Sequence, residues 1–303
     1  MESPPETRPA GIALRRVFKC FGTASAVEDL TLEVARGSVF GLLGPNGAGK
    51  TTTMRMATGI LLPDRGTILH DGAPSGSGSS IRIGYLSEER GLYHRMQVFE
   101  QLTFFAALRG IRRWDAGPAA RRWMERLDLG HLAARRTDEL SKGMQQLLQV
   151  AVALVHDPEI VVLDEPFAGL DPVHVGRLTQ VVKELRDGGA AILLSTHAME
   201  QAEDICDRVG FLNRGVKIAE GSPSDLQAHG TRLVRAVFRG PAPVDFSHPH
   251  VIAAQAQGSS LTVECAPDLS PVTLIEALAA RGEIVDLESR KARLRDVFLG
   301  MVR

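Results

Sequence analysis

The chain has 303 residues, of which 44% are hydrophobic and 23% charged, and its formal net charge at pH 7 is −1. This composition excludes an intrinsically disordered chain, and the near-zero charge argues against a nucleic-acid-binding protein. No apolar run approaches the roughly 18 residues that a membrane-spanning helix needs, and the polar segment 1–9 lacks the apolar centre of a signal peptide. We therefore expect a folded protein of about two domains, which would serve a membrane only by binding another chain.

The first predicted elements form a strand–turn–helix unit. Residues 12–19 and 27–34 are expected to be strands, the second because apolar and polar residues alternate along it. The continuous apolar run 39–43 predicts a strand buried on both faces. A glycine-rich turn and a helix over about 50–59 follow. This order is the opening unit of an α/β nucleotide-binding fold.

A helical block interrupts the predicted sheet. Residues 73–80 are expected to be a flexible loop and 81–86 a short strand. The stretch from about 97 to 156 is predicted to be helical, with breaks near Gly117–Pro118 and Gly130. Strands and helices then alternate, with strands at 160–163 and 191–195 and a helix at 172–187. This alternation predicts a parallel sheet with helices on its faces, into which the helical block is inserted.

The character of the sequence changes after about residue 222. Strands are predicted at 232–238, 260–265 and 283–287, and helices at 271–281 and 292–302. The segment 221–225 is expected to be the linker. We therefore expect a nucleotide-binding domain over 10–222 and a small α+β domain over 223–303.

The segment Gly44–Thr51 reads GPNGAGKT and fits the phosphate-loop pattern G-x-x-x-x-G-K-[ST]. Its glycines let successive backbone N–H groups point at phosphate oxygens, and the following helix adds the positive end of its dipole. Lys50 can reach the β- and γ-phosphates, and the Thr51 hydroxyl can bind Mg²⁺. The alternative is a glycine-rich turn without function, but its position between a buried strand and a helix favours the phosphate loop. The residues expected to bind ATP are Gly44, Pro45, Asn46, Gly47, Ala48, Gly49, Lys50, Thr51 and Thr52.

The apolar strand 160–163 ends in two acids, Asp164 and Glu165. Carboxylates at the carboxyl end of a buried parallel strand face the ligand-binding edge of such sheets. Asp164 is predicted to orient Mg²⁺ or its water ligand, and Glu165 to act as the general base that polarises the attacking water. The alternative is a solvated strand end before the turn at Pro166.

A second predicted anion site lies at the start of the apolar helix 145–155, which follows Leu140-Ser141-Lys142-Gly143-Met144. Serine is a favourable helix N-cap, and glycine allows a ligand to approach closely. Because one subunit would not aim two such sites at one γ-phosphate, we expect this helix tip to serve the ATP of a partner subunit. A plain helix cap is the alternative.

The order of these motifs, completed by Gly169-Leu170-Asp171 and Ser195-Thr196-His197, resembles the ATP-binding cassette (ABC) family over about residues 12–222. The resemblance implies a P-loop NTPase cassette with a RecA-like α/β core, an antiparallel β subdomain and an inserted α-helical subdomain at about 90–156. It also implies ATP and Mg²⁺ as cofactors, a homodimer, and a separate transmembrane permease subunit at the cytoplasmic face of the cell membrane.

The family pattern implies roles for the matching positions. Phe21 matches the aromatic residue that stacks on adenine, and Ser141, Lys142, Gly143 and Met144 match the signature that closes on ATP across the dimer. Asp171 matches the loop that links the two sites, and His197 the histidine that contacts the γ-phosphate.

Two departures from the family pattern concern these sites. Lys142 and Met144 replace a glycine and the glutamine of the usual L-S-G-G-Q signature, whereas the serine and Gly143 remain. A glutamine that usually contacts Mg²⁺ and the attacking water is replaced by an acid. We assign Glu88 to that position, although the sequence leaves Glu88 and Glu89 both open.

The variant signature, the loop 88–93 and the α+β tail resemble the single-cassette branch of ABC-2-type exporters. The expected function is an ATPase that powers transport through a separate transmembrane subunit by ATP-dependent dimer closure. Two alternatives stay open: a soluble ABC-type ATPase in translation or DNA repair, and a nucleotide-binding regulator without turnover. The transported substrate is not evident from the sequence.

Overall fold

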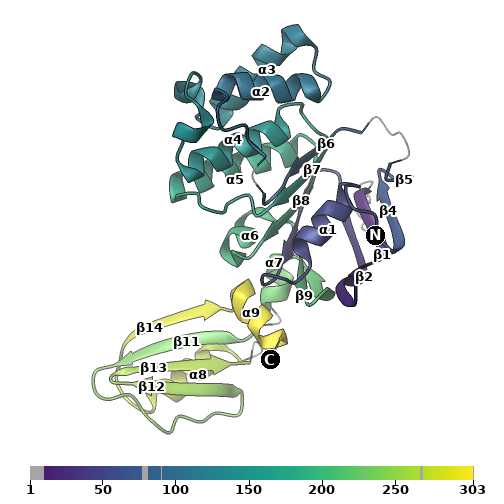
Figure 1. Cartoon of the computed structure of the whole chain (residues 1–303). Helices are drawn as coiled ribbons and strands as arrows, with labels where there is room; N and C mark the ends of the chain where they lie inside the picture. The colour runs from purple at the N-terminus through teal and green to yellow at the C-terminus, as the bar shows by residue number, and fades with distance from the viewer. Residues whose placement is uncertain (1–9, 77–80, 90, 229, 267–268, 303) are drawn as a thin grey trace, which may run out of the picture. The chain divides into compact units, whose positions relative to one another are not determined.

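The computed structural model describes residues 10–302, apart from 77–80, 90, 229 and 267–268. The predicted N-terminal segment 1–9, part of the predicted loop 73–80 and the expected start of the helical subdomain at residue 90 lie outside the described residues. The chain divides into two compact units, Met1–Glu220 and Gly221–Arg303 (Figure 1). The division falls within two residues of the predicted domain boundary.

A four-stranded antiparallel sheet opens the first unit, in the strand order β2-β1-β4-β5. Its strands are β1 (Ala10–Phe21), β2 (Ala24–Ala35), β4 (Arg65–His70) and β5 (Ala73–Pro74). Leu14 faces Leu32, and Val17 faces Leu30, so the apolar residues of β1 and β2 share the buried face. The predicted loop 73–80 is wrong at its start, because Ala73–Pro74 pair with Leu69 and His70 as a short edge strand.

A six-stranded sheet forms the centre of the unit, in the order β10-β9-β3-β8-β7-β6. It contains β3 (Ser38–Leu43), β6 (Ile83–Leu86), β7 (Ile160–Asp164), β8 (Ala191–Thr196), β9 (Arg208–Asn213) and β10 (Val216–Gly221). The strands β6, β7, β8, β3 and β9 run parallel. The helices α1 (Lys50–Ala57) and α5 (Pro172–Asp187) pack on this sheet and lie on either side of it in Figure 1. Residues of β3, β7 and β8 are almost completely buried, which explains their continuous apolar runs.

The carboxyl ends of β3, β7 and β8 lie at the same edge of this sheet. Leu43 pairs with Thr196, and Asp164 pairs with Ser195. The segments that follow these three strands, although about 30 to 150 residues apart in sequence, must therefore meet at one place.

The helical block contains α2 (Val98–Leu108), α3 (Arg113–Arg126) and α4 (Lys142–Leu154), and the short α6 (Met199–Ile205) follows β8. The predicted break at Gly117–Pro118 is wrong, because both residues lie inside α3 and the chain instead leaves the helix between α2 and α3. Proline costs one backbone hydrogen bond in the first turns of α3. The helix gains the complete burial of Ala120 and Trp123 on the same face. The predicted break near Gly130 corresponds to a 3₁₀ turn at Gly130–Leu132.

The second unit is an antiparallel sheet with helices, in the strand order β12-β13-β11-β14. It consists of α7 (Pro223–Ala228), β11 (Arg232–Phe238), β12 (Val251–Gln257), β13 (Ser260–Cys265), α8 (Pro271–Ala279), β14 (Ile284–Lys291) and α9 (Leu294–Met301). Alternate residues of β11 and β13 form its core with Leu274 and Leu278 of α8. In the part of the chain that the structure describes, no helix has both the length and the apolar character needed to cross a bilayer.

Candidate active site

The phosphate loop joins β3 to α1 and is shaped by glycines. Gly47 and Gly49 have φ angles of 77° and 101°, in the left-handed region that glycine tolerates best. A Cβ atom on Gly49 would lie 2.3 Å from the carbonyl oxygen of Ala26, so no larger residue fits there. No side chain caps the start of α1. The first backbone N–H groups of this helix are therefore available to an anion.

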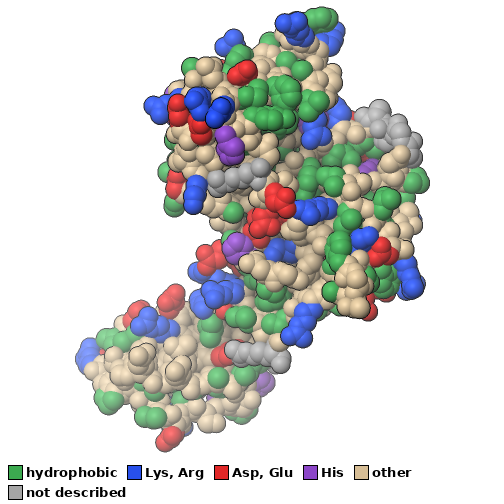
Figure 2. Space-filling model, in the orientation of Figure 1, with side chains coloured by type: hydrophobic (Ala, Val, Ile, Leu, Met, Phe, Trp, Pro, Cys, Tyr) green, Lys and Arg blue, Asp and Glu red, His purple; other side chains and the backbone are tan. Residues whose placement is uncertain are grey.

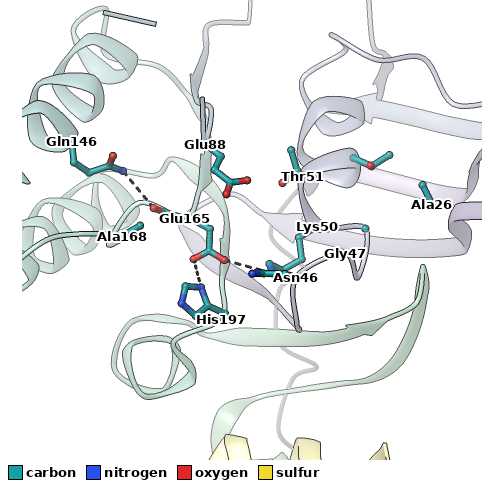
Figure 3. Close-up of a pocket in the computed structure, with 12 residues that line it drawn as sticks. Ala26, Asn46, Gly47, Lys50, Thr51, Glu88, Gln146, Glu165, Ala168 and His197 are labelled. Atoms are coloured by element: carbon teal, nitrogen blue, oxygen red, sulfur yellow. Dashed lines mark hydrogen bonds and ion pairs between the residues drawn. The ribbon is translucent and has the colours of Figure 1, made fainter. Parts of the chain in front are cut away.

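This loop forms one wall of a pocket of about 480 Å³ (Figure 3). The pocket brings together most of the residues predicted to bind ATP and Mg²⁺. Its lining consists of Ala26, Asn46, Gly47, Gly49, Lys50, Thr51, Thr52, Glu88, Gln146, Glu165, Ala168 and His197. The predicted residues Gly44, Pro45 and Ala48 belong to the same loop but do not line the pocket.

Glu165 lies between Lys50 and His197 in this pocket (Figure 3). The Lys50 ammonium is 3.5 Å from Glu165 Oε1, and His197 Nδ1 is 2.9 Å from Glu165 Oε2. Lys50 also donates hydrogen bonds to the carbonyl oxygens of Gly44 and Pro45, at 2.8 and 3.2 Å. The lysine charge is thus balanced by groups of the chain itself, and an entering phosphate must compete with them.

Asp164 is buried directly before Glu165, with an exposed fraction of 1%. Its Oδ1 accepts a hydrogen bond of 2.5 Å from the Ser195 hydroxyl. Its Oδ2 is buried and has no hydrogen-bond partner among the described residues. A buried carboxylate oxygen without a partner is costly, and a hard cation with oxygen ligands would satisfy it.

The donor set fits a magnesium ion that is bound together with a nucleotide. Thr51 and Glu88 line the pocket and offer further oxygen atoms. Among the described residues, no group of three His, Cys, Asp or Glu side chains is arranged to hold a metal ion. Mg²⁺ commonly takes only one or two carboxylates and completes its coordination with phosphate oxygens and water, so the residues present are compatible with it.

Glu88 and Glu89 lie in different surroundings. Glu88 lines the pocket. Glu89 forms an ion pair of 3.0 Å with Arg55, and 85% of its side chain is exposed. The geometry therefore favours Glu88 as the acid that faces a nucleotide, which the sequence alone left open.

The signature residues occupy the start of α4 and do not line this pocket. Ser141 is the N-cap, and its hydroxyl accepts a hydrogen bond of 3.2 Å from the Met144 backbone N–H. Ser141 and Lys142 are exposed, and Met144 is half-buried. Gly143 packs so closely that a Cβ atom there would lie 3.2 Å from the Gly169 carbonyl oxygen. The tip of α4 is thus open to a ligand that the pocket of the same chain does not hold.

Gln146 is a pocket residue that the sequence analysis did not single out. Its side-chain amide donates to the carbonyl oxygens of Pro166 and Glu165, at 3.2 and 3.4 Å. It therefore connects the signature helix to the loop that carries the predicted base. No sequence signal marked this residue, because α4 contains three glutamines, Gln145, Gln146 and Gln149, of which only Gln146 lines the pocket.

Phe21 and Asp171 also lie outside the pocket lining. Phe21 ends β1 with 54% of its surface exposed, and the Lys19 ammonium is 5.8 Å from its ring centre. Asp171 is the N-cap of α5 and accepts hydrogen bonds from the backbone N–H groups of Val173 and His174, at 3.0 and 3.1 Å. The bond from the His174 backbone, followed by that from its side chain, lowers the pKa of the Asp171 carboxyl.

Comparison with known proteins places this geometry in a family. The sequence profile of the ABC transporter family matches residues 27–168. YhaQ, an uncharacterised ABC transporter ATP-binding protein of Bacillus subtilis strain 168, is 35% identical over 96% of this chain and 98% of its own length. A Nod factor export ATP-binding protein I of Paraburkholderia xenovorans is 38% identical over 96% of each chain.

Among solved structures, the ATP-binding subunit of an ABC transporter has a TM-score of 0.66 and 30% sequence identity, covering 71% of this chain and 91% of that one. The parallel sheet, the phosphate loop and the acidic end of β7 are thus parts of a cassette whose family members hydrolyse ATP. The chain belongs to the ABC transporter family, as one of its ATP-binding and ATP-hydrolysing subunits.

Proposed function

We propose that two copies of this chain form the ATPase dimer of a membrane exporter, whose membrane-spanning part is a separate permease subunit. The dimer would lie at the cytoplasmic face of the membrane, and its closure on ATP would drive transport. The relative named for Nod factor export favours an export function. The proposal of dimer closure is supported by the positions of two anion sites in each chain.

The observation that carries this proposal is the separation of two anion sites within one chain. The pocket with Lys50 and Glu165 holds one site. The tip of α4 at Ser141 is a second site, exposed and absent from the lining of that pocket. In a dimer with a two-fold axis, the Ser141 tip of each copy would lie over the pocket of the other copy. Two nucleotides would then be enclosed between the two copies.

Within each enclosed site, the side chains have distinct tasks. Lys50 and the loop N–H groups hold the β- and γ-phosphates, and Phe21 stacks on adenine. Glu165 accepts the proton of the attacking water, while His197 holds the Glu165 carboxylate and reaches the γ-phosphate. Thr51, Asp164 and Glu88 would hold Mg²⁺, which when bound neutralises charge on the phosphate oxygens. Asp171, at the start of α5, belongs to the loop between the two sites.

The permease would dock on an aromatic cluster formed by Tyr93, Phe104 and Phe105. The ring centres of these residues are 5.4 to 5.9 Å apart, and Tyr93 and Phe104 are 52% and 42% exposed. Figure 2 shows hydrophobic side chains gathered over the helical part of the first unit. Glu88, which lines the nucleotide pocket, precedes Tyr93 by only five residues in the chain, so that a change at the phosphates can reach a docked partner.

Complementation between two inactive variants tests the shared site. Lys50→Ala removes the phosphate grip and Ser141→Arg blocks the helix tip, so each variant alone should lose ATP turnover. In a mixed dimer, the intact Ser141 of the first variant meets the intact Lys50 of the second, and one of the two sites is rebuilt. Phosphate release should therefore reappear on mixing, with a maximum near equal amounts.

Full ATP turnover by Ser141→Arg alone, or no recovery when an ATP-dependent mixed dimer forms, would contradict the shared site. The membrane role needs a separate test, in which the tagged chain is purified from detergent-solubilised membranes. Wild type should bring down a polytopic membrane protein, and the double variant Tyr93→Ser, Phe104→Ser should not. An active dimer without such a partner would favour the alternative of a soluble ABC-type ATPase.

A further inference from the structure

Ser195 is a buried residue near the end of β8 that contacts both acids at the end of β7. Its exposed fraction is 0%. Its hydroxyl donates to Asp164 Oδ1 at 2.5 Å and accepts from the Glu165 backbone N–H at 3.0 Å. None of the roles assigned above explains why a hydroxyl is present at this position.

The position of Ser195 follows from the register of the sheet. It is the direct partner of Asp164 across the parallel ladder between β7 and β8, and the partner of Leu42 on β3. Its hydroxyl has a single proton, which the bond to Asp164 occupies, so the oxygen lone pairs are left for an acceptor role. One side chain can thus hold the carboxylate of Asp164 and the backbone of Glu165 at the same time.

The bond to Asp164 determines which carboxylate oxygen is left for a cation. Oδ1 is occupied by Ser195, whereas Oδ2 is buried without a hydrogen-bond partner among the described residues. A fixed Oδ1 prevents the carboxylate from rotating freely, so that Oδ2 keeps one direction. Groups that hold a metal-binding carboxylate in this manner typically change metal affinity by about 10- to 100-fold when they are removed.

The bond to Glu165 supports an uncommon backbone conformation. Glu165 has a φ angle of 50°, in the left-handed region that non-glycine residues rarely adopt. Its N–H is shared between the Ser195 hydroxyl at 3.0 Å and the Ser195 carbonyl oxygen at 3.2 Å. This turn starts immediately after β7 and carries the Glu165 carboxylate that contacts Lys50 and His197.

We propose that Ser195 is a positioning residue for both acids, which orients Asp164 for Mg²⁺ and holds the turn that presents Glu165 as a base. This inference rests on the proposed metal role of Asp164. The competing explanation is that the hydroxyl only satisfies buried polar atoms, in which case its removal would lower stability without a specific effect on the metal ion.

The test measures Mn²⁺ binding, because Mn²⁺ replaces Mg²⁺ and its free form can be quantified by electron paramagnetic resonance. Full-length variants are titrated with Mn²⁺ in the presence of a saturating non-hydrolysable ATP analogue. Ser195→Ala should raise the Mn²⁺ Kd by about tenfold or more, whereas Ser195→Thr, which keeps the hydroxyl, should stay near wild type. Thr196→Val is the matched control, because the Thr196 hydroxyl is buried on the same strand and accepts from the Ala198 N–H instead.

A double-mutant cycle separates the possible failures. Asp164→Asn alone should weaken Mn²⁺ binding, and adding Ser195→Ala to it should cause no further loss, since Ser195 acts through Asp164. An unchanged Kd for Asp164→Asn would contradict the proposed metal role itself. If Asp164→Asn weakens binding but Ser195→Ala has the Kd of wild type, only the positioning role is overturned. Equal losses in Ser195→Ala and Thr196→Val would likewise overturn it in favour of a general structural effect.

Discussion

The Lys50 ammonium lies 3.5 Å from Glu165 Oε1, although both side chains are predicted to act on the same nucleotide. Both are largely buried, with 7% and 12% of their side chains exposed. The cation that should bind the phosphate is therefore paired with the acid that should activate water. ATP binding must exchange this internal partner of Lys50 for a phosphate.

Glu165→Gln should separate ATP binding from ATP turnover. ATP should bind about fivefold more tightly, because the substitution removes a negative charge worth roughly 1 kcal/mol of repulsion toward an entering phosphate. Turnover should fall by about 10²- to 10⁴-fold with the loss of the base. A fluorescent ATP analogue gives the Kd and a phosphate-release assay gives the rate. Glu125→Gln, on the exposed face of α3, is the control that should change neither. Weaker binding by Glu165→Gln would contradict the proposed competition for Lys50.

Glu88→Gln and Glu89→Gln form a matched pair. Glu88 lines the pocket, whereas Glu89 pairs with Arg55 at the surface. Replacing Glu88 removes a charged oxygen ligand, so the Mg²⁺ concentration for half-maximal turnover should rise several-fold. Replacing Glu89 should leave this concentration unchanged, because exposed ion pairs contribute little. The same shift in both variants would argue against a specific role of Glu88.

Gly49→Ala should destabilise the first unit more than Gly47→Ala. Both residues have positive φ angles, but only at Gly49 would a Cβ atom meet the Ala26 carbonyl oxygen, at 2.3 Å. At Gly47 no atom of the described residues beyond its chain neighbours lies within 4 Å of the added Cβ, so the expected cost is the left-handed conformation alone, about 1 kcal/mol. At Gly49 the overlap adds roughly 1–3 kcal/mol. The stabilities of the two variants are compared by their urea concentrations at the midpoint of unfolding. Equal midpoints would refute the close contact at Gly49.

His156 predicts a pH dependence of stability. It is 4% exposed, its Nε2 is 3.1 Å from the Ile83 carbonyl oxygen, and burial lowers its pKa below the ordinary value of 6.5. At pH values between 6.5 and the pKa of His156 in the folded state, the unfolded chain binds a proton that the folded chain does not. The folded state therefore loses stability as the pH falls through this window, by at most about 1.4 kcal/mol per pH unit.

His156→Gln removes this titration and keeps an N–H donor for Ile83. The stability of the variant should depend less on pH than that of wild type below about pH 6.5. Urea unfolding in buffers on both sides of this pH gives the two slopes. Identical slopes would show that His156 does not contribute to the pH dependence.

Strands that are buried on both faces were predicted well, because such strands consist almost entirely of apolar residues. The strands β3, β7 and β8 are continuous apolar runs because helices α1 and α5 and the antiparallel sheet of β1 and β2 pack over their faces. The strand β9 was not predicted, since Gly210 in its centre resembles a breaker. In the fold this glycine leaves room for the Phe40 ring, which would lie 3.1 Å from a Cβ atom. The strand β12 was missed because its alanines and glutamines show no clear alternation.

The pocket residues that follow the strands β3, β7 and β8 could be predicted, because each of these strands is followed by a motif in the sequence. The glycines around Lys50 and the acids after β7 imply chemistry by residue type alone. Gln146 and Ser195 depend instead on helix packing and strand register, because their partners are backbone carbonyls and a carboxylate far along the chain. A glutamine or serine in such a position has no local sequence pattern that distinguishes it from an ordinary core polar residue.

The side-chain amide of Gln146 should couple ATP hydrolysis at the two sites of the proposed dimer. This amide donates hydrogen bonds from α4, whose N-cap is Ser141, to the backbone of Glu165 and Pro166. When the Ser141 end of α4 moves toward the ATP of the neighbouring subunit, the position of Glu165 in the same subunit should therefore change. The two nucleotides of a dimer would then not be consumed independently. Their turnover should be sigmoidal in ATP concentration, and severing this single amide contact should bring the Hill coefficient toward one.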